Sequence, residues 1–167
     1  MENKVRMGVV SDTHIPRRKK ELPVELMEAF KGVNRIVHAG DINKDYVLYE
    51  LEELAPVTAV AGNTDDDYIR GMLGTKKVIE VGNYKIGVIH GDGERGTTFD
   101  RARKAFEGEG VSCVIFGHSH IPMNRSIENV LYFNPGSPTD KRSQERYSCG
   151  IITVDKEGIR GEIIDWL

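Results

Sequence analysis

Five short segments of this 167-residue chain contain side chains that can bind a metal ion. They are Ser11-Asp12-Thr13-His14, His38-Ala39-Gly40-Asp41, Gly62-Asn63-Thr64-Asp65, His90-Gly91-Asp92 and Gly117-His118-Ser119-His120. Each segment comes at the end of an apolar run that is typical of a β-strand. Four of the five histidines, His14, His90, His118 and His120, lie at such ends, whereas random placement would scatter them over helices and surfaces. Because α/β folds place ligands at the carboxyl ends of strands, the sequence predicts one shared site.

The candidate ligands taken from these segments are two carboxylates, four imidazoles and one amide oxygen. They belong to Asp12, His14, Asp41, Asn63, His90, His118 and His120. Oxygen and nitrogen donors without a thiolate suit Mn, Ni, Co, Fe or Zn better than Ca or Mg, and Mn is our first expectation. Seven donors are too many for one tetrahedral ion, but two ions about 3.5–4 Å apart that share a carboxylate would use them, which favours displacement at phosphorus. The alternative is a cluster of buried, hydrogen-bonded polar residues.

The apolar periodicity predicts the elements that position these segments. Strand patterns alternate with helical patterns through the first two thirds of the chain, which is typical of βαβ units on a largely parallel sheet. Expected strands are 5–10, 35–39, 57–61, 77–81, 85–90, 113–116, 124–127, 130–133, 148–154 and 160–164, and expected helices are 22–32, 47–54 and 99–106. The fold class is therefore α/β, with two mixed β-sheets packed as a sandwich flanked by helices. We expect the second sheet to come mainly from the C-terminal end, and a single domain over residues 1–167.

Composition and charge narrow the class of protein. Apolar residues make up 39% and charged residues 29% of the chain, which excludes a disordered or collagen-like protein. The net charge of -3 gives no basic footprint for extended nucleic acid or a membrane surface. There is no signal-peptide pattern and no apolar run of about 18 residues, so we expect a cytoplasmic protein. Cys113 and Cys149 lie in apolar stretches and are expected to be buried free thiols.

In the order in which they occur, the motifs D-x-H, G-D, G-N-x-D, H-G and G-H-x-H resemble those of the calcineurin-like metallophosphoesterase superfamily. The resemblance spans residues 8–122 and is greatest with the small, capless phosphodiesterases of bacteria and archaea. These also carry an Asn-Pro-Gly-Ser motif, here residues 134–137. The resemblance implies αββα layers and hydrolysis of a phosphodiester by a hydroxide held between two metal ions.

The resemblance also implies a role for each ligand. Asp12, His14 and His120 match the ligands of the first metal, Asn63, His90 and His118 match those of the second, and Asp41 matches the bridging aspartate. The expected catalytic residues are Asp41, Asn63 and His90.

Two positions depart from the pattern of the superfamily. Its larger phosphatases have His after the Gly-Asn pair, usually interpreted as a general acid or phosphate contact, where this chain has Thr64. Many small members have His two residues after the His-Gly ligand, where this chain has Asp92. Thr cannot supply a proton near neutral pH, so protonation of the leaving group is in question, with Asp65 and Asp92 as the alternative acids.

Other polar residues have plainer interpretations. His38 lies within a strand pattern and is expected to be a hydrogen-bonded core histidine. Asp66 and Asp67 are expected to be solvated or to cap a helix, and Asp65 to orient a ligand. The run Arg-Arg-Lys-Lys at 17–20 could contact a phosphodiester, although such runs are mostly solvated surface. Residues 134–137 are expected to form a tight turn, with a functional role left open.

We therefore expect a metal-dependent phosphodiesterase whose partner is a phosphate-ester small molecule or a nucleotide. A phosphomonoesterase or nucleotide phosphatase on the same site is one alternative, disfavoured by Thr64. A non-catalytic interaction scaffold of the same fold is another, disfavoured by the complete ligand set. A nuclease is a third, disfavoured by the absence of room for a cap domain. A homo-oligomer is compatible with the sequence.

Overall fold

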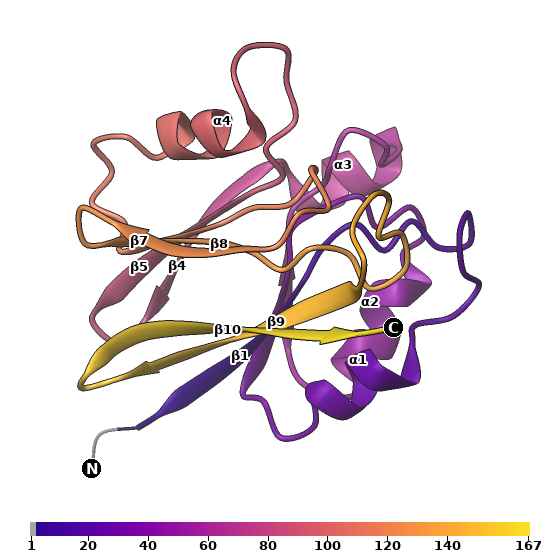
Figure 1. Cartoon of the computed structure of the whole chain (residues 1–167), viewed down its shortest axis with the longest axis horizontal. Coiled ribbons are helices and arrows are strands. Elements are labelled where there is room, and N and C mark those ends of the chain that lie inside the picture. The colour runs from indigo at the N-terminus through magenta and orange to yellow at the C-terminus, as the bar shows by residue number, and fades with distance from the viewer. Residues whose placement is uncertain (1–2) are drawn as a thin grey trace.

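In the computed structural model, residues 3–167 form two five-stranded sheets that stack face to face, with helices on the outside (Figure 1). The apolar side chains between the sheets include Val9 and Val37 from one sheet and Val88 and Ile115 from the other, all fully or almost fully buried. Burial of this layer stabilises the sandwich and fixes the relation between the strand ends of the two sheets.

The first sheet has the strand order β10-β9-β1-β2-β3. Its strands are β1 (Val5–Val10), β2 (Arg35–His38), β3 (Val57–Ala59), β9 (Tyr147–Asp155) and β10 (Gly158–Trp166). The pairs β1–β2 and β2–β3 are parallel, whereas β9 pairs antiparallel with both β1 and β10. The carboxyl ends of β1, β2 and β3 therefore lie at one edge of the sheet.

The second sheet has the order β4-β5-β6-β8-β7. Its strands are β4 (Lys76–Val81), β5 (Tyr84–Ile89), β6 (Cys113–Ile115), β7 (Met123–Ile127) and β8 (Val130–Asn134). The β4–β5 and β7–β8 pairs are antiparallel hairpins, and β5, β6 and β8 run parallel. The ends of β5 and β6 thus lie together, as do the ends of the first three strands.

Four helices lie outside the sheets within the described residues (Figure 1). They are α1 (Val24–Ala29), α2 (Tyr46–Glu52), α3 (Asp67–Leu73) and α4 (Thr98–Ala105). Leu26 of α1 and Leu51 of α2 share a core cluster with Ile36 of β2, whereas Ala102 of α4 packs with Val114 of β6. None of the helices in the described part of the chain is long and apolar enough to cross a membrane.

The predicted fold class is confirmed, and each predicted strand and helix has a counterpart with bounds shifted by a few residues at most. The origin of the second sheet was only partly predicted: β6, β7 and β8 belong to it, but β9 and β10 return to the first sheet. The reason is burial on both faces of β9, where Ile151 packs under the helices and Ile152 packs between the sheets. Local periodicity cannot tell which of two sheets supplies such a partner.

For helix α3 the sequence predicted a capping residue but not the extent of the helix. Its N-cap residue is Asp66, whose carboxylate accepts a hydrogen bond from the Ile69 main-chain N–H at 2.9 Å. The capping interpretation of Asp66 is therefore confirmed. The two cysteines are buried free thiols, as expected, and burial raises the pKa of both.

Candidate metal centre

The loops that follow β1, β2, β3, β5 and β6 meet where the strand ends of the two sheets come together. Main-chain hydrogen bonds hold the first two loops side by side: Asp12 N–H donates to the Gly40 carbonyl and His14 N–H to the Asp41 carbonyl. The Gly117 N–H likewise donates to the His90 carbonyl. The structure thus brings together all seven candidate ligands, in two adjacent groups.

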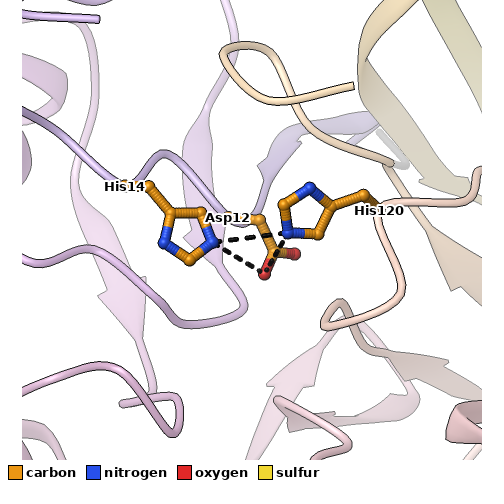
Figure 2. A group of neighbouring side chains, drawn as sticks. All are labelled: Asp12, His14 and His120. Carbon is orange, nitrogen blue, oxygen red and sulfur yellow. Dashed lines mark hydrogen bonds and ion pairs between the residues drawn. The ribbon is translucent and has the colours of Figure 1, made fainter. Parts of the chain in front are cut away.

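The first group consists of Asp12, His14 and His120, all buried. Nε2 of His14 lies 3.3 Å from Nε2 of His120, and these nitrogens lie 3.7 and 3.4 Å from Oδ1 of Asp12. Figure 2 shows both imidazole rings directed toward this carboxylate from opposite sides. Three donor atoms therefore surround one small volume.

The second group consists of Asp41, His90 and His118. Nε2 of His90 lies 3.1 Å from Oδ2 of Asp41. Asn63 adjoins the group, because its Oδ1 lies 3.2 Å from Nδ1 of His118. The grouping matches the one that the resemblance implied.

Asp41 lies between the two groups. Its Oδ2 is 3.5 Å from Nε2 of His14 in the first group and 3.1 Å from Nε2 of His90 in the second. Its other oxygen, Oδ1, accepts a hydrogen bond from the Thr64 N–H at 2.9 Å. One carboxylate oxygen is thus held by the backbone while the other is within reach of both groups.

Two polar atoms of the site are buried without any hydrogen-bond partner among the described residues: Oδ1 of Asp12 and Nε2 of His90. Oδ2 of Asp12 is satisfied by the Ser11 hydroxyl at 2.7 Å and the His118 N–H at 3.0 Å. Buried polar atoms without a partner are rare and costly in proteins. These two atoms without partners, together with the mixture of carboxylate oxygen and imidazole nitrogen donors, fit divalent transition-metal cations.

Hydrogen bonds on the far side of the histidine rings fix which nitrogen faces the site. Nδ1 of His90 donates to the Ala39 carbonyl at 2.7 Å, which leaves Nε2 directed at Asp41. Nδ1 of His120 likewise bonds the Asp140 carbonyl. Such partners are typical of metal-binding histidines, because they set the tautomer and the ring orientation.

The charges of the site shift each other's pKa values. Burial opposes ionisation of Asp12, yet the neighbouring His120, His14 and His90 hold its pKa well below the usual range. Burial likewise opposes protonation of His90, but Asp41 and Asp12 raise its pKa to about 9. Without a cation, the site therefore favours a protonated imidazole between two carboxylates, which is the charge that a metal ion would replace.

The backbone of the ligand loops is strained. Five of the seven candidate ligands are non-glycine residues with positive φ: Asp12 (59°), His14 (43°), Asp41 (58°), His118 (68°) and His120 (61°). This left-handed conformation is uncommon for residues with a Cβ and concentrates at functional sites. Gly62 is required for a different reason, since a Cβ there would collide with the Asp41 carboxylate.

His38 lies at the end of β2, buried behind the ligands, and is the hydrogen-bonded core histidine that the sequence predicted. Its Nδ1 accepts the Gly40 N–H at 3.1 Å, so Nε2 carries the proton and donates to Thr13 Oγ1 at 3.0 Å. Burial lowers the pKa of His38 to about 3, so the ring is neutral. His38 thereby connects the loop of the first group to the loop that carries Asp41.

Asp65 orients the second group through the backbone, the role that its place in the sequence indicated. Its carboxylate accepts N–H bonds from Asp41 at 3.0 Å, Asn43 at 2.7 Å and Gly62 at 2.8 Å. Burial raises its pKa, but N–H donors face both oxygens and favour the ionised form. Asp65 is therefore a structural acceptor with neither oxygen directed to a leaving group.

Thr64 occupies the exposed rim of the site beside the second group. Its hydroxyl accepts a hydrogen bond from Nδ2 of Asn43 at 2.8 Å. Asp92, also exposed, is close enough to raise the pKa of His118, although burial and His90 lower that pKa overall. Of the two alternative acids, Asp92 is therefore the better candidate.

The segment from Asn134 to Asp140 donates hydrogen bonds to the backbone of the loops that carry the first group. Nδ2 of Asn134 donates to the Gly117 carbonyl at 3.0 Å, and Oγ of Ser137 donates to the Asp12 carbonyl at 2.8 Å. Oγ1 of Thr139 donates to the Thr13 carbonyl at 2.6 Å. The Asn-Pro-Gly-Ser motif is therefore a turn that positions ligand loops through their backbones.

Two arginines brace the second group, and sequence analysis missed both. Arg70 of α3 donates to the carbonyls of Asp65 at 3.2 Å and Asn63 at 3.2 Å, and Arg101 of α4 donates to the Gly91 carbonyl at 2.8 Å. These bonds hold the loops of Asn63 and His90. No pattern in the sequence marks a donor to main-chain carbonyls, so neither arginine nor Thr139 could have been found in advance.

Comparisons with known proteins show the family to which the chain is similar. The sequence profile of the calcineurin-like phosphoesterase superfamily domain matches residues 5–157. A probable metallophosphoesterase of Methanothermobacter thermautotrophicus is 39% identical over 160 residues, 95% of this chain and 91% of the relative. A phosphodiesterase of Methanocaldococcus jannaschii is 25% identical over 163 residues, 89% and 87% of the two chains. The solved structure of Vps29 from Chaetomium thermophilum has a TM-score of 0.78 at 17% identity and covers 97% of this chain and 98% of its own.

The chain therefore belongs to the calcineurin-like phosphoesterase superfamily. Its class is that of the metal-dependent phosphoric ester hydrolases, and the structure contains two groups of residues that could hold a metal ion. The likeness to Vps29 extends to the fold alone.

Proposed function

We propose that this protein is a phosphodiesterase whose two ligand groups hold a pair of divalent cations, with Mn as the first candidate. The observation that carries the proposal is the pair of buried atoms without partners, Oδ1 of Asp12 and Nε2 of His90, which lie 3.8 Å apart and belong to different groups. Leaving such an atom unsatisfied costs about 1–3 kcal/mol. A site that keeps two of them face to face is built for a ligand between them.

A pair of divalent cations supplies a hydroxide nucleophile near neutral pH and neutralises charge on the phosphoryl oxygens. The residues around the site orient the side chains that would hold the cations. The Thr64 N–H fixes one oxygen of Asp41 so that the other faces both groups. The Ala39 carbonyl keeps the proton of His90 on Nδ1, which leaves the Nε2 lone pair directed into the site.

A diester is the favoured substrate because the rim lacks a histidine that could protonate an alkoxide. Thr64 is at that position, and its hydroxyl cannot donate a proton to a leaving group near neutral pH. The archaeal relative named a phosphodiesterase supports the same substrate class. A monoesterase on this site would depend on Asp92 as the acid.

The test is hydrolysis by chelator-treated and Mn-loaded protein, with bis(p-nitrophenyl) phosphate as the diester and p-nitrophenyl phosphate as the monoester. We expect Mn-dependent turnover with a higher kcat/KM for the diester. A higher kcat/KM for the monoester would make the protein a phosphomonoesterase. No turnover of either ester by protein that binds Mn would favour the scaffold alternative.

A further inference from the structure

Four cationic side chains lie on two loops that reach the first ligand group: the loop after β1 carries His14, and the loop between β8 and β9 carries Asp140, whose carbonyl bonds His120. Arg18 and Lys19 follow β1, and Lys141 and Arg142 lie between β8 and β9; we call these four the basic rim. The Nζ atoms of Lys19 and Lys141 are 4.4 and 5.8 Å from the centroid of the same ring, that of Tyr147. Figure 1 shows the indigo loop after β1 and the orange loop before β9 on the same side of the molecule.

Two residues of the basic rim, Arg18 and Arg142, contact a candidate ligand or the neighbour of one. Nε of Arg18 lies 3.3 Å from Oδ2 of Asp140, the residue whose carbonyl bonds His120. Nη1 of Arg142 donates to the carbonyl of His118 at 3.3 Å. The rim is therefore adjacent to both ligand groups.

The arrangement differs from a solvated charge run in two respects. Arg142 has a φ of 50°, an unfavourable conformation for a residue with a Cβ, and this backbone brings its guanidinium to His118. The aromatic face of Tyr147 attracts the ammonium groups of two lysines that repel each other. Both features gather positive charge at one place in a chain whose net charge is -3.

The acidic side chains near the rim do not cancel its charge. Asp140 is paired with Arg18, whose side chain is still 59% exposed. Residues 15–21 carry four cations and one carboxylate, Glu21. Guanidinium and ammonium groups in such a cluster suit a phosphate dianion, through charge-assisted hydrogen bonds.

We propose that the basic rim binds a second phosphate group of the substrate, beside the scissile diester. The preferred substrate is then a small nucleotide diester with an additional terminal phosphate. The scissile diester in this inference rests on the proposed function. The second phosphate rests on the basic rim alone.

The kinetic test uses two substrates that differ by one phosphate: the 5′-p-nitrophenyl ester of thymidine 5′-phosphate, and the same ester with a 3′-phosphate. Both release p-nitrophenol, so any difference reports the extra phosphate. We expect kcat/KM to be on the order of tenfold higher for the 3′-phosphorylated ester, mainly through KM. The ratio should fall toward one in Lys19→Gln and Arg142→Gln, and stay unchanged in Lys31→Gln, an exposed cation just after the C-terminal end of α1 that pairs with Glu28.

Calorimetry separates failure of this inference from failure of the proposed function. Thymidine 3′,5′-bisphosphate and thymidine 5′-monophosphate are titrated into Mn-loaded protein, whether or not the protein hydrolyses the esters. Tighter binding of the bisphosphate that is lost in Lys19→Gln and Arg142→Gln supports the rim even if turnover is absent. Equal affinity for the two nucleotides, or a preference that survives both substitutions, overturns it.

Discussion

Oδ2 of Asp41 lies 3.1 Å from Nε2 of His90, and that nitrogen has no hydrogen-bond partner within residues 3–167. Burial opposes ionisation of Asp41, but His90 lowers the pKa of the carboxyl group, so the carboxylate is ionised at neutral pH. In the metal-free protein His90 is protonated, and loss of that proton would turn the two atoms into an acceptor pair for a cation. The same oxygen is 3.5 Å from Nε2 of His14, so Asp41 is within reach of both groups and is the proposed bridging residue.

Asp41→Asn should therefore lose more activity than any change of a single terminal ligand. An amide bridges two cations poorly, so we expect kcat/KM with saturating Mn to fall by more than about 100-fold. Bound metal, measured by mass spectrometry, should fall as well. The matched control is Asp67→Asn, which removes an exposed carboxylate on α3. If Asp41→Asn kept the wild-type rate while Asp12→Asn lost it, the bridge would have been assigned to the wrong residue.

Removal of metal should abolish turnover and lower thermal stability. Mn, Ni or Co should restore both, because oxygen and imidazole donors favour these ions over Mg. A cation at 100 times its Kd adds about 2.7 kcal/mol to the free energy of unfolding, which raises Tm measurably. The measurements are initial rates and Tm of chelator-treated protein before and after metal is added. Equal rates without metal would contradict a metal-dependent reaction.

Loss of the Thr139 hydroxyl should weaken metal binding without removing a ligand. Thr139→Val keeps the shape of the side chain but removes the bonds to the carbonyls of Thr13 and Asp12. We expect the affinity for Mn to fall by about 10–100-fold, as for other residues that hold ligand loops. At saturating Mn, kcat should recover most of its wild-type value. Ser143→Ala, an exposed hydroxyl in the same loop, is the control, and a kcat that stays low at saturating Mn would show that Thr139 does more than position.

His38 should make stability depend on pH. Its folded-state pKa is about 3 against an ordinary value of 6.5, so between these values the unfolded chain binds the proton and the folded protein does not. The contribution of neutral His38 is complete above pH 6.5 and is lost as pH falls, by at most about 1.4 kcal/mol per pH unit. His38→Gln should lower the free energy of unfolding by about 1–3 kcal/mol at pH 7.5.

The check is urea unfolding of both proteins at pH 7.5, 6.0 and 5.0 with a chelator present. The difference in unfolding free energy should narrow as pH falls, because only the wild type loses the contribution of His38. Groups common to both proteins cancel in this comparison. A difference that stays constant would mean that folding does not lower the pKa of His38.

The contrast between ligands and supports explains what the sequence could predict. His14, His120 and Asn63 were identifiable because a metal site needs particular side-chain types, and those types stand at strand ends. Arg70 and Thr139 act by donating to main-chain carbonyls, which any donor from any element can do. The positions of Arg70 and Thr139 therefore depend on tertiary packing, which the local sequence pattern does not predict.

The same reasoning applies to the fold. The parallel strands β1, β2 and β3 and the hairpin of β4 and β5 follow from local periodicity and from the turn at Gly82-Asn83, and all were predicted. The sheet to which β9 belongs depends on β1, which lies more than 130 residues earlier. Without β9, β1 would be an edge strand with unpaired main-chain groups. That need for a second partner becomes evident only in the assembled sandwich.

Thr64 should make the reaction sensitive to the leaving group. Bound cations would act on the attacking oxygen and on the phosphoryl charge, whereas protonation of the departing oxygen would need an acid, and Thr64 is not one near neutral pH. A positioned general acid contributes about 10²–10⁴-fold, so aryl esters should be favoured strongly over alkyl esters and the rate should depend steeply on leaving-group pKa. The measurement is kcat/KM for a series of aryl and alkyl diesters under conditions where chemistry limits the rate.

Thr64→His should flatten that dependence and raise turnover of alkyl esters, because an imidazole can give a proton where the hydroxyl cannot. Replacing Thr64 also removes the hydroxyl that accepts a hydrogen bond from Nδ2 of Asn43, so Thr64→Val is the control that separates loss of that hydrogen bond from gain of an acid. A wild-type rate indifferent to leaving-group pKa would mean that another acid operates. Asp92→Asn then decides, since Asp65 has both oxygens committed to main-chain N–H groups and Asp92 is the exposed carboxyl group near His118.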